Sequence, residues 1–312
     1  MINTQNLTTL ALALCLSACN GSQQAETPSN VTGLRITAEV ATDVKAERIS
    51  VLPNDIAPWL SQILLLSDGQ LYRTSAGGGK AQAVNAGDVK DMIGLMRKGK
   101  AGTALTLTKA GKISALIEKD DEGRLARMNV STKAESYDGF CQNLTAPNKQ
   151  VIAYSGKDII TLDVSYESDQ VVTIAETKRD TLPKRISSCH VSGENVFVIA
   201  NGQLVSNGAE ISPIASDAHN LTSIASTTSP TFLFNQNGNT LSTLRTAQAD
   251  SLRKVIIEDG LSVTGTQEIS NVFTTADNLG GTFSEGAVIA QDAKTNRLIL
   301  IARPFAQRTL SE

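Results

Sequence analysis

The chain has 312 residues, of which 41% are hydrophobic and 19% are charged, so it can bury a core and is not a disordered chain. Its 28 Lys and Arg residues nearly balance 31 Asp and Glu residues, leaving a net charge of −3. Because phosphate backbones attract a clear basic excess, this balance argues against nucleic acid as the main partner. Two His and four Cys residues leave little material for a histidine-based triad or a zinc site.

The chain opens with an apolar segment, residues 7–18, that is too short to span a bilayer as a helix. It has the length of the apolar region of a signal peptide and ends in small residues. The order Leu-Ser-Ala-Cys, ending at Cys19, resembles a bacterial lipobox, which makes Cys19 the expected lipid-acylated first residue of the mature chain. The alternative is a plain secretory signal cleaved nearby, and the first six residues lack the usual positive charge.

These features predict a signal peptide with a lipobox over residues 1–18 and a flexible tether over residues 19–30. Position 20 is Asn and not Asp, which resembles lipoproteins that are sent on to the outer membrane. We therefore expect a protein of the bacterial cell envelope, lipid-anchored at the outer membrane and facing the periplasm or the exterior.

Residues 31–312 repeat one pattern, an apolar strand, a turn rich in Gly, Asn, Asp or Lys, and a second apolar strand. The turn chemistry predicts a β-hairpin in each repeat. Five of the turns have a glycine, at positions 69, 111, 156, 202 and 238. The six predicted hairpins cover residues 63–73, 105–118, 151–164, 196–207, 231–244 and 287–302.

Four-stranded blades of about 40–45 residues build a β-propeller, so six hairpins predict an all-β, six-bladed propeller in one domain over residues 31–312. A β-solenoid is the alternative, but its repeats are usually shorter and carry a stacking ladder. No long helix is expected, and a strand over residues 34–40 is predicted to close the last blade. Innermost strands are predicted at residues 92–96, 139–144, 186–191 and 221–225.

Two cysteines, Cys141 and Cys189, remain if Cys15 leaves with the signal and Cys19 is acylated. An even pair in an oxidising compartment is a disulfide candidate, and two buried free thiols are the alternative. The predicted strands place the pair on innermost strands of neighbouring blades, where their backbones come close, which favours the disulfide.

Several motifs appear in one order over about residues 35–304. They are DIAPW at 55–59, SDGQLY at 67–72, YDGF at 137–140, the hairpin at 151–164 with its Ser-Gly-Lys turn, FNQNGN at 234–239 and FSEGAVIAQD at 283–292. In this order they resemble the β-propeller phytases, six-bladed calcium-dependent enzymes that release phosphate from myo-inositol hexakisphosphate.

The resemblance implies a site in which calcium ions, held by carboxylates at one mouth of the propeller channel, position phosphate and activate water. It assigns catalytic roles to Tyr137, Lys157 and Asp55. Ligand-binding roles fall to Gln236, Glu268 and Asp292. Any calcium would be held by Asp55, Glu268 and Asp292.

The chain departs from the family where the family carries acidic residues. The corresponding segments are SSCH at 187–190, AN at 200–201, NLTS at 220–223 and TQE at 266–268. Three scattered carboxylates are too few for a centre with several calcium ions. We therefore expect weakened or lost activity, with calcium as cofactor only in an active protein; the alternative is an alignment shifted at these loops and a working 3-phytase-type phosphomonoesterase.

The predicted function is a phytase-like envelope lipoprotein that binds or hydrolyses phosphate monoesters such as myo-inositol hexakisphosphate. The competing prediction is a non-catalytic propeller that serves as a scaffold for protein–protein interaction at the outer membrane. A third is an assembly factor that uses blade edges for β-augmentation. Expected partners are a phosphorylated small molecule, the membrane through the lipid, and a second propeller domain or another protein.

Four other features have an ordinary structural interpretation that we favour. The acidic run at 118–123 is predicted to be a solvated turn, since it lacks the ligand spacing of a calcium loop. The glycine-rich segment at 76–80 is predicted to be a hairpin turn and not a phosphate-binding loop. Trp59, the one Trp of the chain, is predicted to pack in the core, and His190 is predicted to be structural.

Overall fold

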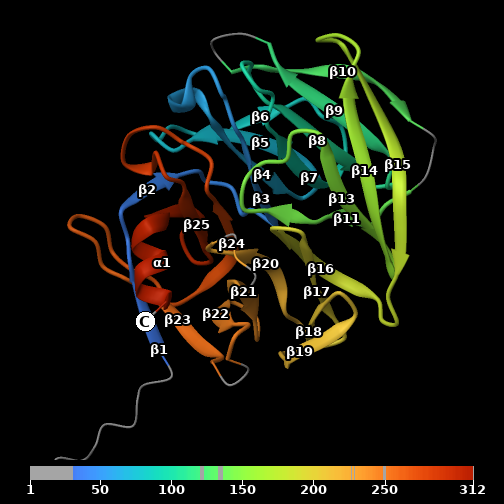
Figure 1. The fold of residues 1–312 in the computed structure, drawn as a ribbon. Helices are drawn as coiled ribbons and strands as arrows, with labels where there is room; N and C mark the ends of the chain where they lie inside the picture. Colours follow the sequence, from blue (N-terminus) through green and yellow to red (C-terminus); the bar gives the residue numbers. More distant parts are fainter. Residues whose placement is uncertain are drawn as a thin grey trace, which may run out of the picture. The chain divides into compact units, whose positions relative to one another are not determined.

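The computed structural model describes residues 31–119, 123–132, 136–225, 227, 229–248 and 251–311. The predicted signal peptide, the tether and Cys19 lie outside the described residues. From Val31 onward the chain forms one compact unit, and its strands are arranged as a ring of mainly antiparallel sheets (Figure 1). Among the described residues, no helix has the length and apolarity needed to cross a bilayer.

The first half of the chain forms two sheets, one of four and one of eight strands. The four-stranded sheet consists of β3 (Arg48–Leu52), β4 (Gln62–Ser67), β5 (Gln70–Ser75) and β6 (Gln82–Val84). The eight-stranded sheet contains β7 (Val89–Leu95), β8 (Thr103–Thr108), β9 (Ile113–Glu118) and β10 (Leu125–Thr132), followed by β11 (Gly139–Phe140), β13 (Gln150–Ser155), β14 (Asp158–Tyr166) and β15 (Val171–Thr181).

The second half forms three more sheets. The first has β12 (Gln142–Asn143), β16 (Ile186–Ser192), β17 (Asn195–Ala200), β18 (Gln203–Ser206) and β19 (Ala209–Pro213). The next has β20 (His219–Ser223), β21 (Thr231–Gln236), β22 (Thr240–Arg245), β23 (Arg253–Glu258) and the N-terminal β1 (Val31–Arg35). The last has β24 (Ile269–Thr275), β25 (Ala287–Asp292), β26 (Arg297–Ala302) and β2 (Ala38–Ala41).

Contacts between the first strands of the sheets close the ring. β3 contacts β7, β7 contacts β11, β16 contacts β20, β20 contacts β24, and β24 returns to β3. Between β11 and β16 the link is covalent, because Cys141 and Cys189 form a disulfide with an S–S distance of 2.04 Å. A closed ring of antiparallel meanders is a β-propeller, so the predicted all-β propeller fold is confirmed.

All of the predicted hairpins form with continuous antiparallel registers. The turn glycines explain why the sequence signal was clear. Gly69, Gly111, Gly156, Gly202 and Gly238 all have φ between 61° and 79°, a region that glycine enters without the cost that a Cβ imposes.

Polar side chains of the first strands also tie some sheets to their neighbours. The hydroxyl of Ser50 on β3 accepts the Gly94 N–H of β7, at 3.1 Å, and Thr222 on β20 accepts the Thr274 N–H of β24, at 3.0 Å. A Cβ at Gly94 would lie 1.7 Å from the Val51 carbonyl oxygen, so this close approach requires glycine. Apolar side chains fill the spaces between neighbouring sheets; Ile63 of β4 and Leu298 of β26, for example, belong to one buried cluster.

A buried ion pair joins three of the first strands. The Arg48 Nε donates to Asp91 Oδ1 at 2.8 Å, and Asp91 also accepts the backbone N–H groups of Phe140, at 2.6 Å, and Met92, at 2.9 Å. Burial acts to lower the pKa of Arg48, but the adjacent Asp91 carboxylate outweighs it and raises that pKa. The carboxylate therefore holds β3, β7 and β11 together.

One prediction about local structure needs correction, and the structure adds elements that the sequence did not predict. The strand expected at 34–40 is two strands, since β1 pairs with β23 in parallel and β2 closes the sheet of β24–β26. The chain also has a helix that the sequence did not predict, α1 (Arg303–Ser311), which buries Ala306 and Leu310. Two short 3-10 helices, η1 (Pro58–Leu60) and η2 (Gly281–Phe283), lie in the connections.

The alternation of strand direction sorts the connections onto two faces of the ring. The connections after the first and third strands of a meander leave from one side, which we call the long-loop face, and include 53–61, 76–81, 96–102, 144–149 and 276–286. The other side, the turn face, carries the tight turns and the links between sheets, including 156–157, 237–239, 259–268 and 293–296.

On the long-loop face, two connections from well-separated sheets meet. The Ala276 N–H donates to the Leu144 carbonyl at 2.6 Å, and the Ala146 N–H donates to Asp277 Oδ2 at 2.9 Å. In ring order the sheets that carry these loops are opposite one another. The loops therefore cross the centre of the ring on this face.

Candidate ligand groove

Five of the six residues with a predicted catalytic or ligand-binding role share the turn face. Tyr137 and Glu268 lie in links between sheets, Lys157 lies in a tight turn, and the other two, Gln236 and Asp292, end β21 and β25. Asp55 follows β3 in connection 53–61 and therefore lies on the long-loop face. The structure does not bring Asp55 together with the other carboxylates.

Each of the three predicted calcium ligands is engaged by other groups of the protein. Asp292 is 2% exposed, and its carboxylate accepts from the Lys294 N–H at 2.9 Å and from Arg297 Nε at 3.1 Å. Glu268 forms an ion pair with Lys294 Nζ at 2.9 Å. Asp55 accepts the Gly99 N–H at 2.6 Å.

Burial acts to raise the pKa of Asp292, but hydrogen bonds from Lys294 and Thr295 and the Arg297 guanidinium outweigh it and hold the pKa below its usual value. Across the described part of the chain, no three His, Cys, Asp or Glu side chains gather closely enough to hold a metal ion. Since calcium takes six to eight oxygen ligands, mostly carboxylates, the residues present do not fit a centre with several calcium ions.

Of the remaining predicted residues, two are packed or hydrogen-bonded within the protein and one is exposed to solvent. Tyr137 is 3% exposed and belongs to the apolar cluster between the two meanders of the eight-stranded sheet, β7–β10 and β11–β15. Both ends of the Gln236 amide are bonded, to Ala215 N at 3.2 Å and to Ser242 Oγ at 2.9 Å. Lys157 is exposed in the turn between β13 and β14.

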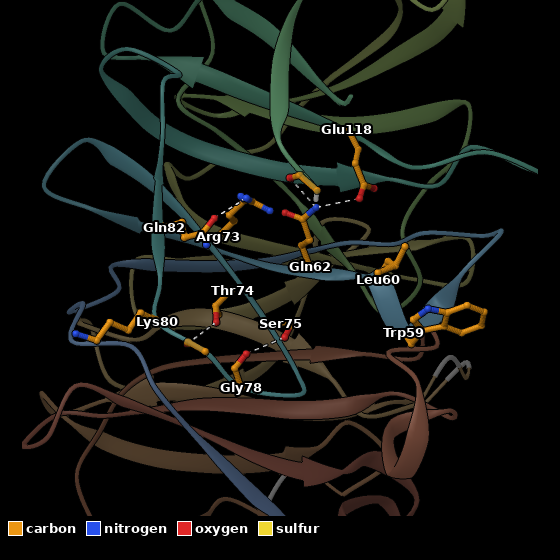
Figure 2. A pocket seen from close by; sticks show the side chains of 12 residues that line it. Trp59, Leu60, Gln62, Arg73, Thr74, Ser75, Gly78, Lys80, Gln82 and Glu118 are labelled. Carbon is orange, nitrogen blue, oxygen red and sulfur yellow. Dashed lines mark hydrogen bonds between the residues drawn. The ribbon is translucent and has the colours of Figure 1, made fainter. Parts of the chain in front are cut away.

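The structure has a groove at a different place from the predicted site residues. On the long-loop face, a groove of about 340 Å³ runs between the sheet of β3–β6 and the end of β9. Its walls come from η1, β4, β5, the glycine-rich loop 76–81, the start of β6, and Glu118 and Gly123. We call it the Trp59 groove; Figure 2 shows Trp59 at one end, Lys80 at the other, and Gln62 between them. Its volume is at the lower end of the range of small-molecule sites.

Trp59 is 70% exposed, so the prediction that it packs in the core is wrong. It sits on η1, in the connection between β3 and β4, which runs over the surface of the sheet. Gly280 of the neighbouring loop, with φ +80°, approaches so closely that a Cβ there would lie 2.9 Å from the Trp59 Cα. The backbone of Trp59 is thus packed while its side chain is open to solvent.

Gln62 begins β4 and is 5% exposed. Its Nε2 donates to Glu118 Oε1 at 3.2 Å and to the Gly123 carbonyl at 3.0 Å. Its Oε1 is buried and has no hydrogen-bond partner among the described residues. Because a buried polar atom without a partner costs free energy, a native structure seldom keeps one without a reason.

Asn54 links the same network to the loop that carries Trp59. Its Nδ2 donates to Glu118 Oε2 at 3.3 Å, and its Oδ1 accepts the N–H groups of Ile56, at 3.2 Å, and Ala57, at 2.9 Å. Glu118, predicted to begin a solvated turn, is instead a bridge between the two sheets. The network fixes the loop beside the second sheet and keeps the groove in shape.

The opposite wall is also held by hydrogen bonds. Arg73 Nη2 donates to Gln82 Oε1 at 2.5 Å, and the hydroxyls of Thr74 and Ser75 donate to carbonyls of the glycine-rich loop. Gly78 and Gly79 have φ values of +99° and +111°, which favour glycine. The loop connects β5 to β6, which pair in antiparallel fashion, as expected of the predicted hairpin turn.

The comparisons with known proteins give no family. No protein-family model matches the chain, and no curated protein matches it. Among solved structures, a crystal structure of BBS1N in complex with ARL6DN is 7% identical, with a TM-score of 0.44 over 82% of this chain and 77% of that one. The β-propeller domain of Cps50 (Swd1) from Myceliophteria thermophila is 10% identical, with a TM-score of 0.49 over 84% of this chain and 85% of that one. At these values neither match bears on the site, and the resemblance to phytases stays a prediction.

Proposed function

We propose that this chain is a non-catalytic β-propeller that binds a polar ligand in the Trp59 groove. The observation that carries the proposal is the exposed Trp59 ring at one end of a groove whose other lining residues are mostly polar. A bound ligand would cover the exposed ring, and this burial of apolar surface favours the complex over the free protein.

We also infer that the propeller has six blades. The eight-stranded sheet consists of two antiparallel meanders joined by parallel pairing of β10 with β15, from Asn129 opposite Val171 to Thr132 opposite Ile174. Treated as two blades, these meanders bring the five hydrogen-bonded sheets to six blades. This count agrees with the resemblance to the β-propeller phytases.

Ligand-observed NMR with a library of small polar fragments tests the proposed function. We expect some fragments to give a binding signal with the full chain. We expect this binding signal to disappear with the variants Trp59→Ala and Gln62→Leu. Leu261→Ala is the matched control, because Leu261 is 97% exposed on the turn face. If no fragment depends on Trp59 or Gln62, the groove is not a binding site and the proposal fails.

A second candidate function, binding or hydrolysis of a phosphate monoester, is favoured by a cluster on the turn face. The Asp138 carboxylate lies 4.0 Å from Lys90 Nζ and 3.9 Å from Arg185 Nη2, and it accepts the Gly156 N–H at 2.9 Å. Lys157 follows Gly156 in the same turn. Two cations lie beside this carboxylate, and with Lys157 next in sequence they leave positive charge for a phosphate group.

Phosphate release from myo-inositol hexakisphosphate, with and without calcium, separates the two candidates. If the protein only binds a ligand in the groove, it releases no phosphate. Calorimetric titration with calcium is then expected to show no binding heat. Release that requires calcium and falls with Lys157→Ala would establish the phytase-like function instead.

We propose further that Cys19 anchors the protein to the envelope through lipid, on the strength of the Leu-Ser-Ala-Cys order. Cys19→Ala is expected to move the protein from the membrane fraction to the soluble fraction of a bacterial host and to abolish labelling by a palmitate analogue. Retained labelling in this variant would contradict acylation at Cys19.

A further inference from the structure

We infer that the long-loop face of the propeller docks on the surface of a lipid bilayer, with Trp59 and Phe305 at the contact. This inference goes beyond the proposed ligand groove, and it rests on the proposed lipid anchor at Cys19. It names the face that the anchored propeller turns toward the membrane.

Exposed apolar side chains gather on one face of the ring. Six large apolar side chains are exposed in the part of the chain that the structure describes, and one of them, Leu261, is on the turn face. The other five are at the long-loop face: Val31, Ile56, Trp59, Leu252 and Phe305. Because single exposed apolar residues are normal, it is their one-sided distribution that indicates an interaction surface.

The strand directions place these side chains. Ile56 and Trp59 lie in connection 53–61, which follows the first strand of its sheet. Leu252 directly precedes β23, in the connection that follows the third strand of its sheet. Val31 begins β1, which pairs with β23 in parallel from Val31 opposite Lys254. Both of these strands therefore begin on the long-loop side.

Helix α1 extends the same surface. It follows β26 and buries Ala306 and Leu310 in an apolar cluster of the propeller, while Arg245 Nε donates to the Leu310 carbonyl at 2.9 Å. Its other side presents the exposed Phe305, with the guanidinium carbon of the exposed Arg308 5.8 Å from the centre of the ring. An aromatic ring beside a long cationic side chain suits the boundary between lipid headgroups and acyl chains.

The position of Val31 indicates what covers this surface. Val31 lies at the long-loop end of β1, and Cys19 precedes it by 12 residues. An extended segment of this length reaches at most about 40 Å. A lipid on Cys19 therefore keeps the long-loop face close to the bilayer, which makes the bilayer the partner that the exposed side chains meet.

The kinds of side chain agree with a lipid surface. Trp is enriched at membrane interfaces, where its ring lies among apolar groups and its N–H stays near water. Apolar contact with lipid requires no particular orientation of the Trp59 ring, and it does not depend on the charges of the face. The groove beside Trp59 is not needed for this contact.

Trp59 is the one Trp in the chain, so its fluorescence reports this face in the full, acylated protein. The protein is reconstituted into phosphatidylcholine vesicles whose acyl chains carry bromine, a quencher that acts at short range. We expect Trp59 to lose about half of the emission that it has in vesicles without bromine, because its ring lies at the boundary of the acyl chains.

A matched reporter on the opposite face is the control. Trp59→Phe combined with Leu261→Trp moves the fluorophore to the turn face, at a position where the native side chain is 97% exposed. Its emission is expected to be equal in the two kinds of vesicle. Equal quenching of both reporters would overturn the inference, because neither face would then be the one that contacts lipid.

Substitutions far from Trp59 in sequence test whether the face docks as a whole. Leu252→Asp combined with Phe305→Asp changes two exposed side chains and is expected to reduce the quenching of Trp59 at least twofold. Leu261→Asp is expected to leave the quenching unchanged. Full quenching in the double variant would also overturn the inference, since the contact would then involve Trp59 and its loop alone.

Flotation of the same samples separates this inference from the proposed functions. Protein that floats with the vesicles while Trp59 stays unquenched has a lipid anchor, but its long-loop face is not the docking surface. Protein that does not float has lost both the anchor and the docking face. Fragment binding is measured by NMR without vesicles, so the Trp59 groove stands or falls separately.

Discussion

Two neighbouring seams of the propeller are closed in different ways at their outer edge. Between the meanders of β7–β10 and β11–β15, the outer strands β10 and β15 pair in parallel, so hydrogen bonds run unbroken across the seam. Between the sheet of β3–β6 and the meander of β7–β10, β6 pairs only with β5 in the described chain. The Trp59 groove lies in this second seam.

Strand length explains the difference. β10 has 8 residues and β15 has 11, whereas β6 has 3. The glycine-rich loop uses the residues before β6, and too little strand remains to reach across. A seam that backbone pairing leaves open has to be bridged by side chains, and polar side chains that bridge a gap are also placed to meet a ligand.

The inner side of both seams depends on one carboxylate, and its loss is expected to have the largest effect. Asp91→Ala leaves Arg48 buried without its partner and removes the acceptor of the Phe140 N–H. Breaking a buried ion pair by removing one member costs about 3–5 kcal/mol. Urea unfolding measures the loss, with Asp138→Ala as a control at an exposed carboxylate; a loss under about 1 kcal/mol for Asp91→Ala would show that the seams do not depend on it.

The next seam, between β11 and β16, is closed covalently, which permits a second test. The Cys141–Cys189 disulfide spans 48 residues of sequence, and removing such a bond typically costs about 2–4 kcal/mol. Cys141→Ala with Cys189→Ala is expected to lower the free energy of unfolding by that amount. Thiol titration of the unfolded wild-type protein gives a direct check, since two reactive thiols from these residues would contradict the bond.

The seam between β16 and β20 is expected to weaken in acid. His190 is buried, its Nε2 lies 2.7 Å from Ser223 Oγ and accepts the Ser223 N–H, and burial lowers the pKa of His190 to about 3. The unfolded chain takes up a proton near pH 6.5 and the folded chain does not, so stability falls as the pH drops from 7 toward 3.

Between pH 7 and pH 5 this histidine alone accounts for a loss of about 2 kcal/mol. The loss is measured by urea unfolding at both pH values, and a His190→Asn variant should show a smaller slope. An equal slope in the variant would mean that other groups cause the pH dependence.

A substitution in the seam that holds the Trp59 groove is expected to have the smallest effect on stability. Trp59→Ala removes an exposed ring and is expected to change the free energy of unfolding by no more than about 0.5 kcal/mol, while it abolishes ligand binding. Thermal unfolding and calorimetry on the same sample check both parts. A loss of more than about 2 kcal/mol would make Trp59 a packing residue, as the sequence alone suggested.

The sequence predicted the parts of the fold that depend on local chemistry. A turn glycine between two apolar runs determines a hairpin within about a dozen residues, and the structure has each of the predicted hairpins. The parallel pairing of β10 with β15, the division of residues 34–40 between two sheets, and helix α1 depend on contacts between distant segments, and no local pattern carries them.

The site was less accessible to sequence analysis for the same reason. Gln62 and Glu118 are 56 residues apart along the chain and meet by folding. A lone Trp in an apolar stretch looks like a core residue, and the signal against it was Pro58, directly before it, which places Trp59 in a connection and not in a strand. Asp55, Glu268 and Asp292 were predicted together by resemblance, yet Asp55 lies on the opposite face.

The first two strands have a consequence for how the protein is made. β2 completes the sheet of β24–β26, and β1 pairs with β23, so the earliest strands to be synthesised depend on the latest. β1 has no partner in the ring until the ribosome has delivered residues 253–258, and β2 has none until residues 297–300 follow. Closure of the ring is thus the final event of folding, and a nascent chain that lacks β26 has an open ring.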